Sequence, residues 1–289
     1  MENKSKVLLV LTIGVFAIGV SSILIRLTDA PPIVIATYRV SISSLIIAPI
    51  YFTYKNKFRL KEIAKFIHIS IFLAAHFTLW ITSLKYTTVA SSTVLVTTNP
   101  IFVPIFSYIF FKERIKKKLI LGIVIAISGS FLIALSSKNA IGKGSLLGNV
   151  LALLGAVAYS LYFTFGKRVR EKAELIPYIF FTYLLTSLLL ILVSLITKEN
   201  LFNYSRYTYL MFFLVALIPQ VIGHTAYNYS LRYLDPSFIA VTILGEPVIA
   251  TIGAFFILKE VPTVFEITGA ILILIGIYIS VLVEQQNSV

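Results

Sequence analysis

The sequence predicts an all-α integral membrane protein with ten transmembrane helices, arranged as two five-helix repeats of inverted topology. Three observations support this fold class: the composition, a recurring series of apolar runs, and an internal repeat. Apolar residues make up 58% of the 289 residues and charged residues only 13%, with a mean hydropathy of +0.94. A soluble domain carries about 25% charged residues. The chain therefore has too few polar groups to cover a water-facing surface.

The apolar runs are long enough to be membrane helices, because about 20 apolar residues cross a hydrocarbon core of roughly 30 Å. They are continuous rather than alternating, which excludes a porin-like barrel, and a helix satisfies its own backbone hydrogen bonds in lipid. The first run has no small-residue cleavage site after it, so we expect a retained helix rather than a signal peptide. The expected spans are 7–27, 33–53, 63–84, 90–111, 118–136, 146–166, 175–197, 207–231, 237–258 and 263–283.

The basic residues are distributed unequally between the two ends of these spans. Threading the chain through ten helices leaves 17 Lys and Arg on the side that holds both termini and seven on the other, with Arg39 inside a span. Positive residues are retained on the cytoplasmic side. We therefore expect a multi-pass protein of the cytoplasmic membrane with both termini in the cytoplasm. The net charge of +13 then reports orientation and not a nucleic-acid partner.

An internal repeat relates the two halves of the chain. Displacing the sequence by 147 residues aligns 83–135 with 230–282 without a gap, and superimposes Pro100 on Pro247 and Lys112-Glu113 on Lys259-Glu260. Gly122 and Gly129 fall on Gly269 and Gly276. The expected repeats are 7–136 and 146–283. Because five spans separate each element from its counterpart, the two halves run in opposite directions, as in many secondary transporters.

These residues resemble the EamA repeat of the drug/metabolite transporter superfamily. The resemblance rests on Asn99-Pro100 and Phe111-Lys112-Glu113 in the first half and on Gly245-Glu246-Pro247 and Leu258-Lys259-Glu260 in the second, with Thr37-Tyr38-Arg39 in the second span. It covers 7–283 and implies a carrier with a central cavity between the halves. Family members usually export small metabolites such as amino acids, and some import or exchange them.

Arg39 and Glu246 are charged residues that lie away from the ends of their spans, where a charge is expensive and usually faces a cavity or a partner. Glu246 is a candidate for proton coupling or for binding a substrate amine; the alternative is a structural role at the helix break. Arg39 is a candidate for binding a carboxylate, with helix locking as its alternative. Pro100 and Pro247 each remove a helical hydrogen bond at mid-depth, so we expect two matched breaks that line a cavity or act as hinges, or else simple packing kinks.

The remaining candidate substrate-binding residues are polar or aromatic side chains within spans. His76 and Trp80 lie four apart on one helix face, in a helix that lines the cavity in the family. The alternatives are a core histidine and an interfacial tryptophan. The others are Asn99 (the repeat counterpart of Glu246), the pair Tyr159 and Tyr162, and His224, Tyr227 and Asn228, which share one helix face with Gln220.

The sequence thus predicts a secondary active transporter of a small metabolite, with export of an amino acid or related compound as the leading hypothesis. We expect no enzymatic activity, cofactor or metal, since nucleotide-binding and metalloprotease motifs are absent and the chain has no cysteine. The alternative is a membrane-embedded enzyme or lipid-handling protein on the same scaffold. The expected partners are a small solute and the lipid bilayer. Protons, through Glu246, and a second copy of the chain, through the glycine faces, are also compatible with the sequence.

Overall fold

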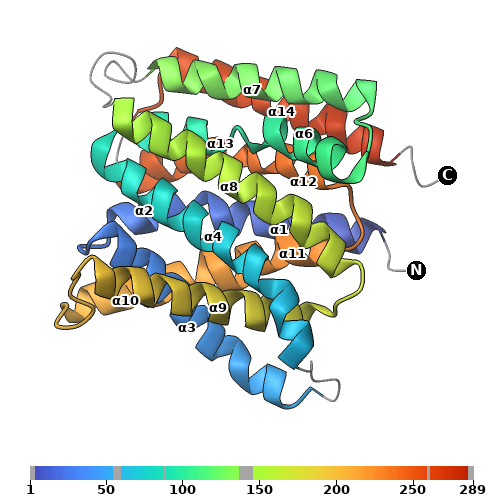
Figure 1. Ribbon diagram of the computed structural model, residues 1–289. Coiled ribbons are helices and arrows are strands. Elements are labelled where there is room, and N and C mark those ends of the chain that lie inside the picture. The colour runs from blue at the N-terminus through green and yellow to red at the C-terminus, as the bar shows by residue number, and fades with distance from the viewer. Residues whose placement is uncertain (1–3, 55–59, 88, 137–145, 259–260, 286–289) are drawn as a thin grey trace.

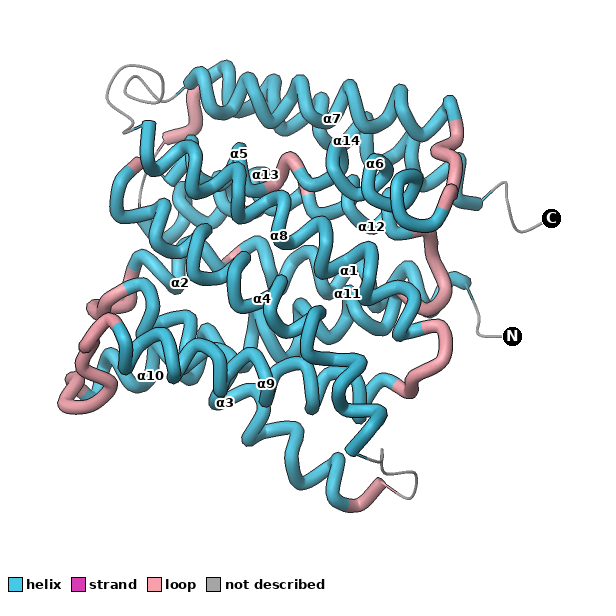
Figure 2. The backbone as a smooth tube through the Cα atoms, in the orientation of Figure 1, coloured by secondary structure: helices cyan, strands magenta, loops and turns pink. Residues whose placement is uncertain are grey.

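A computed structural model describes residues 4–54, 60–87, 89–136, 146–258 and 261–285 (Figure 1). Every regular element in this part of the chain is a helix, and the connecting loops gather at two opposite ends of the bundle (Figure 2). Both chain ends lie at the same end (Figure 1). The elements are α1 (Lys4–Gly19), α2 (Ser21–Arg26), α3 (Pro32–Phe52), α4 (Leu60–Tyr86), α5 (Val89–Val96), α6 (Asn99–Phe111), α7 (Lys117–Ser136), α8 (Leu146–Arg170), α9 (Leu175–Ile196), α10 (Arg206–Val215), η1 (Ala216–His224), α11 (Thr225–Ser230), α12 (Pro236–Ile243), α13 (Gly245–Gly253), η2 (Ala254–Leu258) and α14 (Val264–Gln285).

The helices match the expected spans closely. Within the described residues, nine helical stretches are long and apolar enough to cross a membrane. The remaining expected span, the fifth (118–136), is not among these nine. It corresponds to α7, a helix of 20 residues that packs along α14. The largest shift of a single boundary is in the sixth span, because α8 continues to Arg170, four residues past the expected end. The all-helical membrane fold predicted from composition and hydropathy is therefore confirmed.

Four of the expected spans are interrupted in the described residues, and in three of them a proline sets the interruption. The exception is the first span, which divides into α1 and α2 without a proline. A proline has no N–H to donate, and its ring clashes with the carbonyl group four residues earlier. Accordingly, α5 ends at Val96, four residues before Pro100, and α12 ends at Ile243, four residues before Pro247. The same spacing holds in the eighth span, where α10 ends at Val215, four residues before Pro219, and the chain continues as the π-helix η1.

The packing of the helices is matched between the two halves. The second span contacts the seventh (α3 and α9), and the fifth contacts the tenth (α7 and α14). The third packs on the sixth (α4 and α8), and the first packs on the eighth (α1 and η1), which are equivalent contacts if the halves are exchanged. This pattern of partners is the one that a two-fold repeat requires. The inverted relation itself stays a prediction.

Glycines bring α7 and α14 into backbone contact. A Cβ atom placed on Gly276 would lie 2.6 Å from the carbonyl oxygen of Gly122 and 2.7 Å from the backbone nitrogen of Ala126. Gly129 faces Gly269 in the same way. Small residues allow such close approach between membrane helices. The glycine faces of α7 and α14 therefore pack against each other within the chain.

The ends of several helices are fixed by polar side chains. The Asp235 carboxylate accepts hydrogen bonds from the backbone N–H groups of Ser237 (2.7 Å) and Phe238 (3.3 Å) at the start of α12. Thr263 and Glu266 form a reciprocal capping box before α14. Glu113, which we interpret as a structural residue, forms an ion pair with Arg168 at 2.7 Å. The repeat counterpart of Lys112-Glu113, Lys259-Glu260, lies outside the described residues.

Candidate functional site

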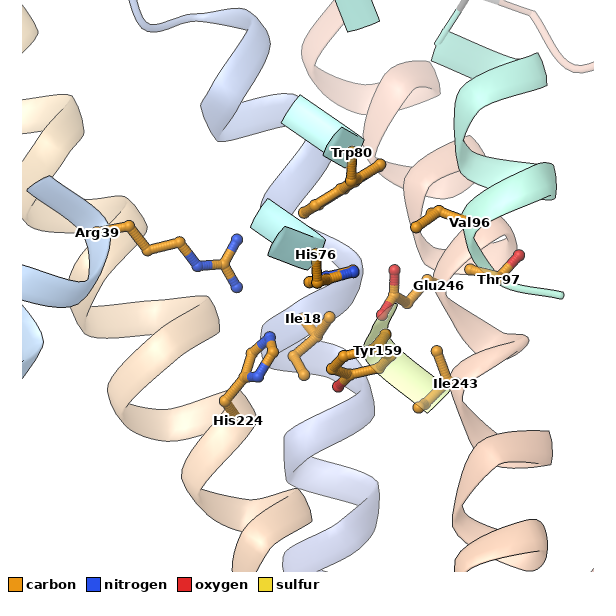
Figure 3. Close-up of a pocket in the computed structure, with 10 residues that line it drawn as sticks. All are labelled: Ile18, Arg39, His76, Trp80, Val96, Thr97, Tyr159, His224, Ile243 and Glu246. Atoms are coloured by element: carbon orange, nitrogen blue, oxygen red, sulfur yellow. The ribbon is translucent and has the colours of Figure 1, made fainter. Parts of the chain in front are cut away.

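A small cavity lies in the middle of the bundle, where the interrupted helices meet (Figure 3). Its volume is about 20 Å³, enough for about one water molecule. Six of the residues singled out from the sequence line it, together with four that were not. The lining residues are Ile18, Arg39, His76, Trp80, Val96, Thr97, Tyr159, His224, Ile243 and Glu246.

Both proline-induced breaks face this cavity. Val96 and Thr97 come from the break between α5 and α6, and Ile243 and Glu246 come from the break between α12 and α13. The two helices also cross there, since α5 contacts α13 and α12 contacts α6. Irregular backbone is tolerated at membrane depth where protein or a cavity surrounds it. The breaks thus place Val96, Thr97, Ile243 and the carboxyl group of Glu246 on the same wall (Figure 3).

Arg39 enters from the opposite wall, on α3 (Figure 3). Its side chain is fully buried, with Nε donating to Oε1 of Gln220 at 2.7 Å and Nη1 donating to Oγ of Ser21 at 2.9 Å. The guanidinium carbon lies 4.5 Å from the centre of the Phe77 ring. Its Nη2 atom has no hydrogen-bond partner within the described residues. Arg39 thus ties α2, α3 and η1 together and keeps one donor free.

Gln220 reaches Arg39 because η1 is a π-helix held by its neighbours. Ser43 of α3 donates to the carbonyl oxygen of Ala216 at 3.1 Å, and Tyr183 of α9 donates to the carbonyl oxygen of Gln220 at 3.4 Å. Short π-helical turns are frequent at functional sites. Here the turn presents Gln220 to Arg39 and His224 to the cavity.

The hydrogen bond of His76 fixes its tautomer. Nδ1 lies 3.0 Å from the carbonyl oxygen of Gly155, which can only accept, so Nδ1 carries the proton in this contact. In the neutral ring, Nε2 is then an acceptor. Gly155 is suited to this contact because a Cβ atom there would lie 3.3 Å from the backbone nitrogen of Trp80. A glycine of α8 therefore orients a histidine of α4.

Aromatic rings form the wall beside His76. Its ring stacks on Tyr159 with centroids 4.4 Å apart and on Trp80 at 5.6 Å. His224 meets the same Tyr159 ring edge-on at 5.6 Å. Trp80 is 4% exposed and lines the cavity, so its placement favours the cavity interpretation over that of an interfacial anchor.

Glu246 stands across the cavity from Arg39 (Figure 3). Its side chain is buried, and within the described residues it has no hydrogen bond and no ion pair with Arg39. An unpaired buried carboxylate is strongly disfavoured in a low-dielectric interior. The carboxyl group of Glu246 is therefore free to bind a proton or to form a hydrogen bond with a ligand.

The other candidates lie near the cavity but are not among its lining residues. Asn99 is fully buried at the start of α6, and neither polar atom of its side chain has a partner within the described residues. Tyr162 donates to Oδ1 of Asn228 at 2.7 Å, so these two side chains bind each other. Tyr227 is fully buried and packs on Phe163. Pro100 and Pro247 do not line the cavity themselves, but the helix breaks that they cause contribute residues to its wall.

Residues that the sequence reasoning did not select also contribute. Gly155 and Ser21 each hold a candidate side chain in place, and Ile18, Val96, Thr97 and Ile243 complete the wall. The proline spacing could have identified the last three, because they lie at or next to the residue four before each proline. No comparable pattern marks Ser21 or Ile18.

An all-helical membrane bundle with a polar cavity at paired helix breaks has the architecture of a membrane transport protein. The chain belongs to the EamA-like transporter family, whose model matches residues 5–135 and 146–282. The family and the two repeats expected from the sequence motifs are thereby confirmed.

Individual relatives agree with this membership. Two proteins of Archaeoglobus fulgidus, each named an uncharacterized transporter, are 23% identical over 99% of this chain and all of theirs, and 27% identical over 96% of this chain and 99% of theirs. A probable amino-acid metabolite efflux pump of Salmonella typhimurium is 28% identical over 59% of this chain and 60% of its own. A solved structure superimposes with a TM-score of 0.82 at 15% identity, covering 99% of this chain and 100% of that one.

Proposed function

We propose that this protein is a secondary active transporter that carries a small metabolite through the cytoplasmic membrane by alternating access. The solute binds in the cavity between the breaks of the fourth and ninth spans. Membership in a transporter family supports this proposal, as do the matched packing partners of the two halves. Both termini lie in the cytoplasm in this proposal, as the distribution of basic residues requires.

The observation that carries the proposal is the separation of charge across the cavity. Arg39 offers a free Nη2 donor on one wall, and Glu246 offers a carboxyl group on the other. Between them lie the His76 ring and its aromatic neighbours. These groups complement a small amphiphilic solute with a carboxylate at one end and an amine at the other. An exported amino acid or related compound fits this description, and the Salmonella relative carries such a name.

The small volume of the cavity supports a mechanism with several conformations. A space of about 20 Å³ holds about one water molecule and no amino acid. Solute entry therefore requires the helices around the breaks to separate. In an inverted-repeat transporter, one group of helices rocks against the other and exposes the site to alternate sides.

Purified protein in liposomes tests the proposal directly. Liposomes loaded with one unlabelled amino acid are diluted into the same labelled compound, and the panel of amino acids is screened in turn. We expect saturable counterflow for at least one member of the panel. Conversion of a compound without movement across the membrane would instead support the membrane-enzyme alternative and would contradict the proposal.

Glu246 is the proposed site of proton coupling, since a buried carboxyl group is stable only when it is protonated or when a cation compensates its charge. We expect Glu246→Gln to abolish uptake driven by a pH gradient, while the protein still inserts and folds. Glu171→Gln is the matched control, because Glu171 is exposed at the end of the bundle. Wild-type dependence of transport on the pH gradient in Glu246→Gln would show that Glu246 has no coupling role.

A further inference from the structure

A second feature of the molecule lies outside the cavity, on the segment that joins α6 to α7. Five of the seven residues from Lys112 to Lys118 are basic, and all five are exposed. The one acidic residue, Glu113, is engaged by Arg168 at 2.7 Å. Within the described residues, no ion pair or hydrogen bond neutralises the side chains of Arg114, Lys117 or Lys118. Among the basic residues of this segment, Lys116 is the one that interacts electrostatically with Glu284. We call residues 112–118 the basic segment.

Stabilisation of the α7 N-terminus does not explain why the basic segment carries these positive charges. Lys117 and Lys118 lie in the first turn of α7, where the helix dipole favours acidic residues and disfavours basic ones. The repeat counterpart shows the contrast. Displaced by 147 residues, Arg114, Lys116, Lys117 and Lys118 correspond to Val261, Thr263, Val264 and Phe265. There, at the opposite end of the bundle, α14 begins with a capping box and no basic residue.

The residues around the basic segment are of the kinds found where a membrane protein meets lipid headgroups. Tyr108 and Phe110, in the last turn of α6, are 53% and 49% exposed, as aromatic residues at a membrane interface are. The Nζ atom of Lys112 lies 5.5 Å from the Tyr108 ring. On the other side, α7 continues into an exposed apolar face that includes Leu121 and Val124. Acyl chains can therefore lie along α7 while the headgroup meets the lysines.

We propose that the basic segment and the exposed face of α7 bind an anionic phospholipid. Clusters of four to eight basic residues beside a transmembrane helix attract anionic lipids, and the segment lies at the end of the bundle that holds both termini (Figure 1). The lipid is held by its headgroup phosphate at Arg114, Lys117 and Lys118. This binding surface is independent of the cavity and of the proposed transport.

The test compares a charge-removing variant with a matched control. Arg114→Gln/Lys117→Gln/Lys118→Gln removes three cations from the basic segment. Lys85→Gln/Lys198→Gln/Arg206→Gln removes two lysines and one arginine from other exposed positions, at the end of α4, in the loop after α9 and at the start of α10. Each protein is reconstituted in phosphatidylcholine, and the association of spin-labelled phosphatidylglycerol is measured relative to spin-labelled phosphatidylcholine. At about a fivefold effect per cation, the triple change is expected to weaken the specific association on the order of 100-fold.

We expect the wild type and the control to prefer phosphatidylglycerol, and the segment variant to lose that preference. Arg114→Lys/Lys117→Arg/Lys118→Arg keeps the charge and is expected to keep the preference, which separates charge from misfolding. Higher ionic strength should reduce the preference of the wild type. Equal preference in the segment variant and the wild type would overturn the proposal. Binding of inorganic phosphate or an oligonucleotide to the segment, without any preference for phosphatidylglycerol, would overturn it as well.

Discussion

At the scale of single residues, the most informative contact is the one between His76 and Gly155. The carbonyl oxygen of Gly155 accepts from Nδ1 at 3.0 Å and leaves Nε2 as the acceptor of the neutral ring. Sequence spacing placed His76 and Trp80 on one face, which the stacked rings agree with. It could not reveal the tautomer, because that is determined by a glycine on another helix.

His76→Phe tests whether this nitrogen serves the solute. Phenylalanine keeps an aromatic ring against Tyr159 but removes both ring nitrogens. Loss of one hydrogen bond, about 0.5–1.5 kcal/mol, corresponds to a roughly 2- to 10-fold rise in the KM of transport. His68→Phe is the control, because His68 is an exposed histidine on the same helix. An unchanged KM in His76→Phe would assign His76 to packing alone.

Helical spacing also could not show which of the other candidate residues reach the cavity. The face of His224, Tyr227 and Asn228 follows from helical spacing, yet only His224 lines the cavity. Asn228 binds Tyr162 instead. Periodicity places residues on a face of a helix, but the neighbouring helix decides which of them reach a cavity. For the same reason, helical spacing places Gln220 on the face of His224 but does not predict that it binds Arg39. Ser21, the other partner of Arg39, carries no sequence signal.

At the scale of helices, the prolines explain why the cavity lies where it does. In the fourth, eighth and ninth spans the regular α-helix ends four residues before a proline, because the proline removes the backbone donor for that residue's carbonyl group. The sequence was sufficient to predict the paired breaks in the fourth and ninth spans. It did not predict the separation of α1 from α2 in the first span, where no proline occurs.

Pro100→Ala tests whether the first break is needed for transport. Alanine restores the donor to the Val96 carbonyl group and favours a continuous helix, since proline is about 3 kcal/mol less favourable than alanine inside a helix. We expect thermal stability to be kept or raised while the transport rate falls by about tenfold or more, a change of about 1.4 kcal/mol in the barrier. Pro104→Ala is the control, because Pro104 lies inside α6 without ending a helix there. A Pro100→Ala protein that transports at the wild-type rate would identify the break as a packing kink.

The contact between α7 and α14 gives a prediction about stability. A Cβ atom on Gly276 would lie 2.6 Å from the carbonyl oxygen of Gly122, and a backbone atom cannot rotate away. Gly276→Ala should therefore force the helices apart and destabilise the protein by about 1–3 kcal/mol. Unfolding in mixed micelles measures the change, with Thr268→Val on the exposed side of α14 as the control. Equal stability of Gly276→Ala and the wild type would mean that this contact is not close in the membrane.

At the scale of the whole molecule, composition and repeat together define the fold, whereas the site depends on how the halves meet. Sparse charge and continuous apolar runs predict the number of helices, because lipid permits few alternatives. The repeat predicts that equivalent helices have equivalent partners, as the contacts of α4 with α8 and of α1 with η1 show. Substrate identity is not encoded at this scale, because a few side chains in one cavity determine it.

The distribution of basic residues gives a prediction for the whole molecule. If the end that carries both termini is cytoplasmic, Lys117 faces the cytoplasm and Phe202, in the loop before α10, faces the outside. The chain contains no cysteine, so single-cysteine variants are made directly in the natural sequence. Both positions are exposed. A membrane-impermeant maleimide added to intact cells should label Phe202→Cys and not Lys117→Cys, and permeabilised cells should be labelled at both. Labelling of Lys117→Cys in intact cells would reverse the orientation and would place the basic segment on the outer surface.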